Sequence, residues 1–317
     1  MVVSSFLAAA VASAQGGARN NPPPREVAVT FDDLPAVSVA KGDLRSLGVF
    51  TDRLLAQFKE NQVPVVGFVN EGKLTVPGEG LEGQSARIAL LGKWLTAGFE
   101  LGNHTYSHRS LNTTPIEEFE ADITRGEPAT SALLGVMGMN LRYFRHPFLQ
   151  VGLDLQKRQA FEAWLQARGY TVAPVTIDND DYIFAAVYAS SLRAGDLARA
   201  GKLADAYVTY MERVFDFVEG LTQSLFGRAI PQVMLLHANE LNADQVGRVF
   251  KHLKARGYAF SSLAHALQDE AYKSPDTYVG RWGISWLHHW ELTMGRPRTG
   301  SPDPPPWVTE AYEKERR

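Results

Sequence analysis

The sequence predicts an α/β protein, a distorted (β/α)7 barrel built as a single domain. From residue 26 onward, short runs rich in β-branched residues alternate with longer amphipathic segments, a pattern typical of βα units around a parallel sheet. Clusters of polar residues follow several of these runs, as expected where the strands of a parallel barrel end. The seven runs that we interpret as strands are 26–31, 63–70, 99–103, 141–145, 170–177, 232–237 and 258–261.

The segments between the strands carry apolar residues at helical spacing. We predict helices at 47–62, 84–97, 115–134, 153–169, 203–226 and 243–257. The connection 178–232 is longer than one crossover needs, so 184–199 is predicted as an added helical element near the strand ends. The barrel pattern spans 26–269, and the tail 270–317, which is rich in tryptophan and proline, is expected to wrap the barrel rather than form a domain.

Composition excludes several classes of protein. The formal net charge is −3 and the pI is about 6.3, so no basic surface supports binding to nucleic acid. The sequence contains no cysteine, which removes disulfides, thiolate nucleophiles and cysteine-type zinc sites. Any metal site must therefore use histidine and carboxylate ligands.

The N-terminal segment is typical of an export signal. Residues 2–14 are apolar and end in Ala-Ser-Ala, and they are too short to span a bilayer. We expect a signal peptide at 1–14, a linker at 15–25, and a periplasmic or extracellular protein; the alternative is a disordered, alanine-rich arm. No other stretch is long and apolar enough to span a membrane. The sequence does not indicate an oligomeric state.

Two of the polar clusters indicate a metal site. Asp32 and Asp33 follow the first strand, and at a turn one carboxylate can bind a cation while the other stays free as a base. His104 and His108 are spaced to place both imidazoles on one side of a helical turn. Two histidines and one carboxylate leave zinc an open position for water, the pattern of a catalytic site. Taken separately, such a carboxylate pair is more often a solvated turn and such a histidine pair is as often packed in a core.

Three further clusters follow later strands, and each alone favours a structural interpretation. They are Arg-His-Pro-Phe at 145–148, Asp-Asn-Asp-Asp-Tyr at 178–182 and Leu-Leu-His at 235–237. Together with Thr-Phe-Asp-Asp at 30–33 and His-Thr-Tyr-Ser-His at 104–108, they resemble in order the motifs TFDD, HxxSH, RxPY, DxxDW and LxH. These motifs characterise the polysaccharide deacetylase family, the NodB-homology or carbohydrate esterase family 4 domain.

The resemblance implies roles for the matching residues. Asp33, His104 and His108 would bind the metal, and Asp32 would be the general base that deprotonates water. His237 would be the general acid that protonates the leaving amine. Two residues would assist them: Arg145 would support Asp32, and Asp178 would hold His237 in its charged form.

The resemblance also implies substrate contacts. The loop containing Pro147 and Phe148 would supply a main-chain N–H to the oxyanion, and Tyr182 and Leu235 would line a small pocket for the acetyl methyl. Phe148 stands where the family has Tyr, and Tyr182 where it has Trp. These departures affect the substrate preference more than the chemistry.

The function that follows is metal-dependent removal of N-acetyl groups from an N-acetylated sugar or glycan, of the chitooligosaccharide or peptidoglycan type. The expected ion is Zn²⁺, with Co²⁺ or another divalent ion as an alternative. Two other functions remain open. One is an O-acetyl esterase or a hydrolase of small non-sugar amides from the same superfamily, and the other is an inactive glycan-binding barrel.

Overall fold

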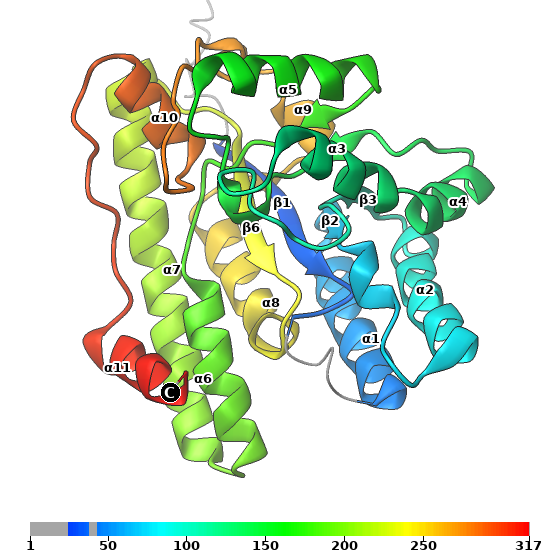
Figure 1. Ribbon diagram of the computed structural model, residues 1–317. Coiled ribbons are helices and arrows are strands. Elements are labelled where there is room, and N and C mark those ends of the chain that lie inside the picture. The colour runs from blue at the N-terminus through cyan, green and yellow to red at the C-terminus, as the bar shows by residue number, and fades with distance from the viewer. Residues whose placement is uncertain (1–24, 38–42, 317) are drawn as a thin grey trace, which may run out of the picture.

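Seven parallel strands form one curled sheet, as predicted (Figure 1). The computed structural model describes residues 25–37 and 43–316, so the expected signal peptide 1–14 and all of the linker except Arg25 lie outside the described residues. Six strands follow the order β5-β4-β3-β2-β1-β6, and β7 pairs with β1. The strands are β1 (Arg25–Leu34), β2 (Val65–Val69), β3 (Glu100–Asn103), β4 (Tyr143–Phe144), β5 (Thr171–Val172), β6 (Gln232–His237) and β7 (Tyr258–Phe260).

β1 lies at the centre of the sheet and fixes its register. Val29 pairs with Val65 of β2 on one side and with Met234 of β6 on the other. After β5 the chain crosses to β6, where Ile177 forms a parallel bridge with Met234. This single bridge links the two ends of the curled sheet, which agrees with the predicted distorted (β/α)7 barrel. The carboxyl ends of the strands therefore meet around one opening.

The helices surround the sheet, and most of them lie where the sequence predicts them. α1 packs against α2 and α8, while α6 packs against both α7 and α8 (Figure 1). The helices of the barrel region are α1 (Leu44–Asn61), α2 (Gly80–Thr96), α3 (Ile116–Arg125), α4 (Pro128–Val136), α5 (Leu155–Ala167), α6 (Asp181–Arg193), α7 (Leu197–Phe226), α8 (Glu240–Ala255) and α9 (Leu263–Ala266). Short 3-10 turns occur at η2 (Glu71–Leu74), η3 (Pro147–Leu149) and η4 (Glu270–Lys273).

The predicted helix 115–134 is two helices, so that prediction was wrong. α3 ends at Gly126, and α4 begins with Pro128 in its first turn, a position that proline favours. A Cβ added at Gly126 would come within 2.9 Å of the Thr105 backbone carbonyl carbon and the Tyr106 amide nitrogen. The break therefore lets the chain approach the loop that follows β3.

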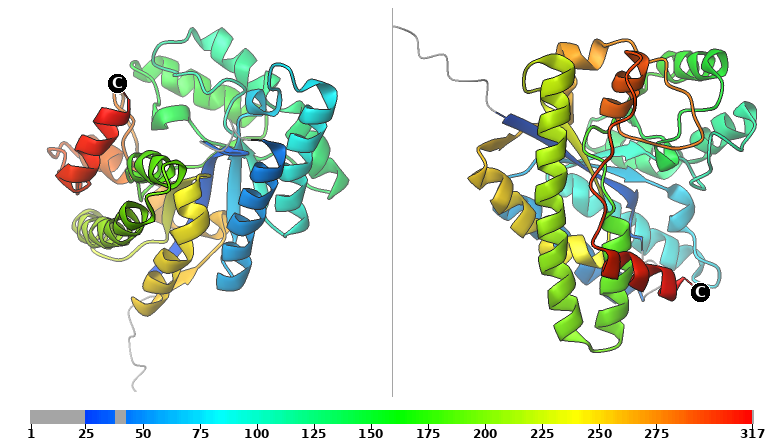
Figure 2. Two further views of the ribbon diagram at one scale, coloured as in Figure 1. Left: turned by 90° about the horizontal axis from the view of Figure 1, so that it is seen from below. Right: turned by 90° about the vertical axis from the view of Figure 1, so that its left-hand side faces the viewer.

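The C-terminal tail lies along the barrel and contains two helices that the sequence pattern did not reveal. α10 (Trp286–Thr293) packs on α7, and α11 (Pro306–Glu315) packs on α6. Figure 2 shows α10 near one end of the long α7 and α11 toward the other, joined by an extended segment. Trp286 and Trp290 are buried, as expected for a tail that wraps the barrel.

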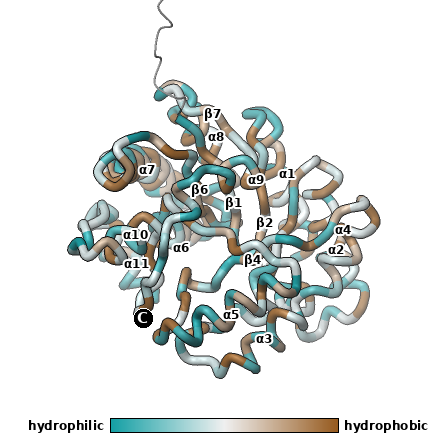
Figure 3. The backbone as a smooth tube through the Cα atoms, turned by 90° about the horizontal axis from the view of Figure 1, so that it is seen from above, coloured by the Kyte–Doolittle hydropathy of each residue, from teal (hydrophilic) through white to brown (hydrophobic). Residues whose placement is uncertain are grey.

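The core is apolar on both sides of the sheet. Phe31 of β1 packs with Phe58 of α1 and Trp94 of α2, and all three side chains are at most 1% exposed. In the view of Figure 3, the hydrophobic residues of β1 and β2 lie near the centre of the molecule. Among the helices of the described residues, none is both long and apolar enough to cross a membrane.

Candidate metal centre and active site

The structure brings together the three predicted metal ligands. Asp33 at the end of β1 and His104 and His108 after β3 each offer a ligand atom, and these atoms lie within 4.8 Å of one another. Nε2 of His108 is 3.7 Å from Oδ1 of Asp33. Within the described part of the chain this is the only group of three or more such residues that could hold an ion.

The two histidines are not on a helical turn, so that part of the prediction was wrong. Residues 104–108 form a loop in which Thr105 and His108 have left-handed backbone angles, with φ of 66° and 55°. The Thr105 hydroxyl accepts a hydrogen bond from the His108 amide at 2.9 Å, and the Asn103 side chain accepts one from the Thr105 amide at 2.7 Å. These bonds hold the two imidazole rings 4.8 Å apart, centroid to centroid.

The three side chains fit a divalent cation by their chemistry. Nδ1 of His104 lies 2.8 Å from the Arg145 carbonyl, so it donates there and leaves the Nε2 lone pair free. Burial lowers the pKa of both His104 and His108, which favours the neutral imidazoles that bind metals. Burial opposes the charge of Asp33, but Lys73 and the histidines outweigh it and hold the pKa of this carboxyl well below its usual range. Two neutral imidazoles and one carboxylate form a typical catalytic zinc set.

Lys73 is a residue of the site that the sequence analysis missed. It lies in η2 after β2, and its Nζ is 2.9 Å from Oδ1 of Asp33 and 3.1 Å from the Asp33 carbonyl oxygen. It therefore orients the Asp33 carboxylate, whose residue has a left-handed φ of 72°. No motif in the sequence distinguishes this lysine from the others.

Asp32 lies beside the metal triad and is almost completely buried. Its Oδ2 is 3.5 Å from Nη1 of Arg145 and 3.8 Å from Nε2 of His104, while its Oδ1 has no hydrogen-bond partner within the described residues. Burial raises the pKa of Asp32 to about 6, against the lowering effect of the Arg145 charge. The arginine is itself fixed by a 2.9 Å hydrogen bond to the Thr30 hydroxyl. A carboxylate with such a pKa can accept a proton near neutral pH.

His237 is paired with Asp181, not with Asp178 as the sequence analysis expected. Its Nδ1 lies 2.6 Å from Oδ1 of Asp181, and its backbone amide donates to Oδ2 of the same carboxylate at 2.8 Å. Asp181 is fully buried at the start of α6 and also accepts a hydrogen bond from Asn242. Asp178 has more of its surface open to solvent, yet desolvation of its carboxyl group and the nearby Asp180 charge raise its pKa to about 7. The assignment of Asp178 was wrong because two carboxylates of the 178–182 cluster fit the motif in spacing, and within the described residues it is Asp181, at the start of α6, that hydrogen-bonds to His237.

The Asp181 carboxylate changes the proton affinity of His237. Burial alone would lower the pKa of this histidine, but the charge and hydrogen bond of Asp181 raise it to about 9. His237 is therefore protonated at neutral pH, with Nδ1 committed to Asp181 and Nε2 free to donate. This arrangement suits a general acid.

The loop after β4 borders the triad on the other side. Phe148 and the following Leu149 both have left-handed backbone angles, with φ of 57° and 54°. The Phe148 ring lies 4.4 Å from the ring of His108, and no hydrogen bond to its amide is found within the described residues. Consecutive left-handed residues cost about 1–3 kcal/mol each, so the surrounding structure must impose them. Pro147 is buried at the start of this loop.

The other two predicted substrate residues lie near the acid. The Tyr182 ring is 43% exposed and its centroid is 6.3 Å from that of His237, while Leu235 is buried two residues before His237 on β6. Tyr312 of α11 lies 6.0 Å from Tyr182, ring to ring, so the tail also reaches this side of the site.

The tail is fixed behind the loop after β4 by buried polar contacts. Asp276 pairs with Arg158 at 2.7 Å and with Nδ1 of His289 at 2.9 Å. His146 of the loop is completely buried, and neither of its ring nitrogens has a hydrogen-bond partner within the described residues. The histidine pair 288–289 is thus used in packing the tail and not in a second cluster of ligands.

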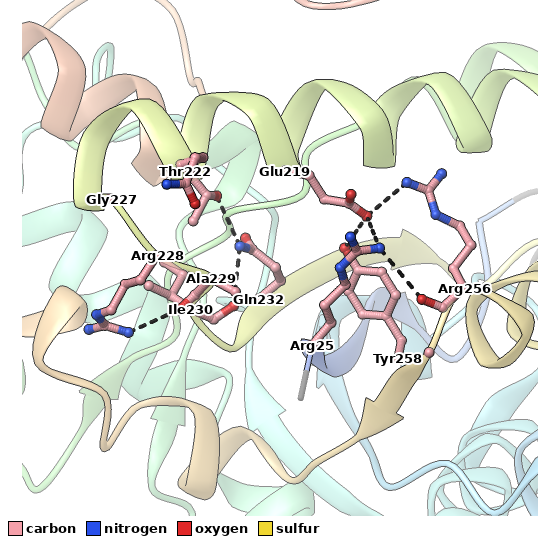
Figure 4. Close-up of a pocket in the computed structure, with 12 residues that line it drawn as sticks. Arg25, Glu219, Thr222, Gly227, Arg228, Ala229, Ile230, Gln232, Arg256 and Tyr258 are labelled. Carbon is pink, nitrogen blue, oxygen red and sulfur yellow. Dashed lines mark hydrogen bonds and ion pairs between the residues drawn. The ribbon is translucent and has the colours of Figure 1, made fainter. Parts of the chain in front are cut away.

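A cavity of about 790 Å³ lies at the opposite end of the barrel (Figure 4). It is lined by the first residues of three strands, including Arg25 of β1 and Tyr258 of β7. Arg25 and Arg256 both pair with Glu219, and Arg256 also pairs with Asp216, so two carboxylates compensate the two positive charges. In parallel barrels this end contributes to stability rather than to catalysis.

Comparison with known proteins shows which family part of the chain is similar to. Residues 19–163 match the polysaccharide deacetylase family. A chitin deacetylase from Colletotrichum lindemuthianum is 27% identical over 159 residues, which are 50% of this chain and 54% of that protein. The chain thus spans about half the length of this curated relative.

Two solved structures show the same fold. They are variants of a CE4-family pseudoenzyme from Bacillus anthracis, one of them with restored enzymatic activity. For the variant with restored activity, the TM-score is 0.50 at 16% identity, and the superposition covers 79% of this chain and 70% of the variant's chain. The other has a TM-score of 0.50 at 15% identity and covers 79% and 69%. The chain is therefore similar to the polysaccharide deacetylase family over residues 19–163, and it shares the fold of the CE4-family structures.

Proposed function

We propose that the protein is a metal-dependent hydrolase that removes N-acetyl groups from an N-acetylated glycan. The observation that carries this proposal is the convergence of three ligands, a buried carboxylate and a protonated histidine. Asp33, His104 and His108 form the ligand cluster, Asp32 lies beside it, and the Asp181-bound His237 borders it. A protein that only bound a glycan would need neither the base nor the acid.

The residues can divide the reaction between them. A divalent ion held by the triad would polarise the amide carbonyl and lower the pKa of a coordinated water. Asp32 accepts the proton of the attacking water as its oxygen bonds to the carbonyl carbon. His237 donates a proton to the amine nitrogen as the C–N bond breaks, so acetate and a free amino sugar are the products. The Phe148 amide is available to donate a hydrogen bond to the developing oxyanion.

Zinc is the ion that we propose, with cobalt as the alternative, because two imidazoles and one carboxylate suit both. The proposed substrates are chitooligosaccharides or the glycan strands of peptidoglycan. The related chitin deacetylase supports this class of substrate. An O-acetyl esterase activity remains the competing proposal within the family.

Acetate release separates these proposals. We expect release from N-acetylated oligosaccharides after loading with zinc, and much less from acetylated xylan or from simple acetamides. Asp32→Asn should retain zinc and lose roughly 10² or more in turnover, the range for a positioned base. Faster acetate release from xylan than from the N-acetylated oligosaccharide would favour the esterase.

We also propose that the protein is exported, on the basis of the apolar segment 2–14 and its Ala-Ser-Ala end. Mass spectrometry of the protein purified from its native cells should then show an N-terminus after residue 14. Recovery of the intact N-terminus from the cytoplasmic fraction would contradict this proposal.

A further inference from the structure

Exposed aromatic side chains gather around the candidate active site. Among residues 25–37 and 43–316, three aromatic side chains are classed as exposed, namely Phe148 at 56%, Tyr182 at 43% and Trp282 at 62%. Phe148 contacts the ligand His108, and Tyr182 lies against the acid His237. Two of the three rings thus lie beside residues of the proposed reaction centre, one at a proposed ligand and one at the proposed acid.

The third ring comes from the C-terminal tail but is anchored beside the first. Trp282 precedes Gly283, where an added Cβ would overlap the carbonyl oxygen of Phe148. Its own carbonyl accepts a hydrogen bond from the Tyr278 hydroxyl at 2.8 Å, and the neighbouring Arg281 carbonyl accepts one from Nε2 of Gln150 at 3.1 Å. The backbone that carries Trp282 is therefore held in place next to the loop after β4.

The Trp282 side chain contributes less to the packing of the tail than the two tryptophans that follow it. Trp286 and Trp290, only a few residues later, are 7% and 2% exposed and pack into the core. The Trp282 ring contacts the Arg281 guanidinium, which lies 4.7 Å from its centroid, yet most of its surface remains open. An apolar ring that is held in place and left exposed beside a reaction centre is typical of a binding surface.

We propose that Trp282 forms an outer subsite that binds a second sugar ring of an N-acetylated glycan. The inference rests on the proposed function and deepens it, because it specifies an oligosaccharide rather than a small amide. Sugar rings present C–H groups on their faces and hydroxyl groups at their edges, so they stack on an exposed indole while staying hydrated. Phe148 lies against His108, and the backbone next to Trp282 contacts the Phe148 carbonyl, so two exposed aromatic residues lie on adjoining segments at this edge of the site.

The test compares Trp282→Ala with wild-type protein on substrates of different length. We expect kcat/KM for a chitin tetramer to fall roughly tenfold, mainly through a higher KM, since a distant sugar contributes to binding in the ground state. Hydrolysis of 4-nitrophenyl acetate, which has no second sugar, should be unchanged. Trp282→Phe should restore most of the kcat/KM for the tetramer. The matched control is Met294→Ala, which changes an exposed residue of the same tail and should leave that kcat/KM unchanged.

Three outcomes would overturn the proposal. They are a kcat/KM for the tetramer within about twofold of wild type, an equal loss on the tetramer and the small ester, or no recovery in Trp282→Phe. Calorimetry in the Asp32→Asn background separates this subsite from the proposed reaction. If Asp32→Asn binds the tetramer roughly tenfold more tightly than the Asp32→Asn/Trp282→Ala double variant, the subsite is supported whatever the activity. If wild type also releases no acetate, the proposed function fails while the subsite remains supported. Equal affinities, or no binding by either, would refute the subsite.

Discussion

Replacing Asp181 by asparagine should move the alkaline limit of activity. The Asp181 carboxylate is the main cause that raises the pKa of His237 from 6.5 to about 9, against the effect of burial. This difference corresponds to about 3 kcal/mol of preference for the protonated imidazole. In the proposed reaction His237 can act as an acid only while it is protonated, so wild-type activity should persist up to about pH 9 and fall above it. In Asp181→Asn the pKa should return to near or below 6.5.

The measurement is kcat/KM for an N-acetylated oligosaccharide as a function of pH. We expect the alkaline limb of Asp181→Asn to shift down by about 2.5 pH units or more, while the acidic limb, set by Asp32 with its pKa of about 6, stays in place. Asp178→Asn is the comparison variant, because it removes a nearby carboxylate of the same cluster, with its own pKa raised to about 7, but leaves the hydrogen bond between Asp181 and His237 in place. An unshifted alkaline limb in Asp181→Asn, or an equal shift in Asp178→Asn, would refute the assignment of the acid and its partner.

Asp181→Asn also puts the fold at risk, which the experiment must monitor. Oδ2 of Asp181 accepts hydrogen bonds from Asn242 and from the His237 amide. An asparagine that turned its NH₂ group toward these donors would leave buried groups unpaired, at a cost of about 1–3 kcal/mol each. Thermal melting should be recorded alongside, and the position of the pH limb compared rather than the absolute rate.

Two further predictions test the metal centre and the contact with the tail. His104→Ala should lose most of the bound zinc in an elemental assay. The control His265→Ala, which changes an exposed histidine, should retain the zinc. Full zinc occupancy in His104→Ala would contradict the ligand assignment. Gly283→Ala should lower the free energy of unfolding by about 1–3 kcal/mol and reduce kcat, because its methyl group displaces Phe148. The control Gly300→Ala has open space around the new methyl group and should change the free energy of unfolding by less than about 0.5 kcal/mol. Equal melting temperatures for Gly283→Ala and Gly300→Ala would show that the contact between Gly283 and Phe148 is not tight.

The strands could be predicted from the sequence because each is a short apolar run with a polar cluster after it. All seven lie within or overlap the predicted ranges, although β5 is reduced to Thr171–Val172 and the rest of its range crosses to β6. The helix break at Gly126 could not be predicted, since it depends on the approach of α3 to the loop at Thr105. The tail helices α10 and α11 are too short to give a clear apolar period.

The site was predictable in composition but not in its pairings. The residues that resemble the family motifs do meet at the strand ends, with Asp33, His104 and His108 close enough to share an ion. Which carboxylate faces His237 depends on where α6 begins, and a shift of three residues separates the exposed Asp178 from the buried Asp181. Lys73 could not be found because its contact with Asp33 joins two different βα units.

The left-handed backbone angles around the metal centre bear on how this protein can be engineered. Six non-glycine residues have positive φ, among those that the structure describes, and every one except Gln62 lies in the segments that build the site. A substitution by glycine relieves this strain without any other change to the backbone, but it removes the side chain at that position. A mutant library screened only for heat resistance should therefore accumulate glycine at positions such as Thr105, His108 and Phe148. The selected variants would be more stable but would lack side chains that the proposed reaction requires. A screen of this protein therefore needs catalytic turnover as a second criterion.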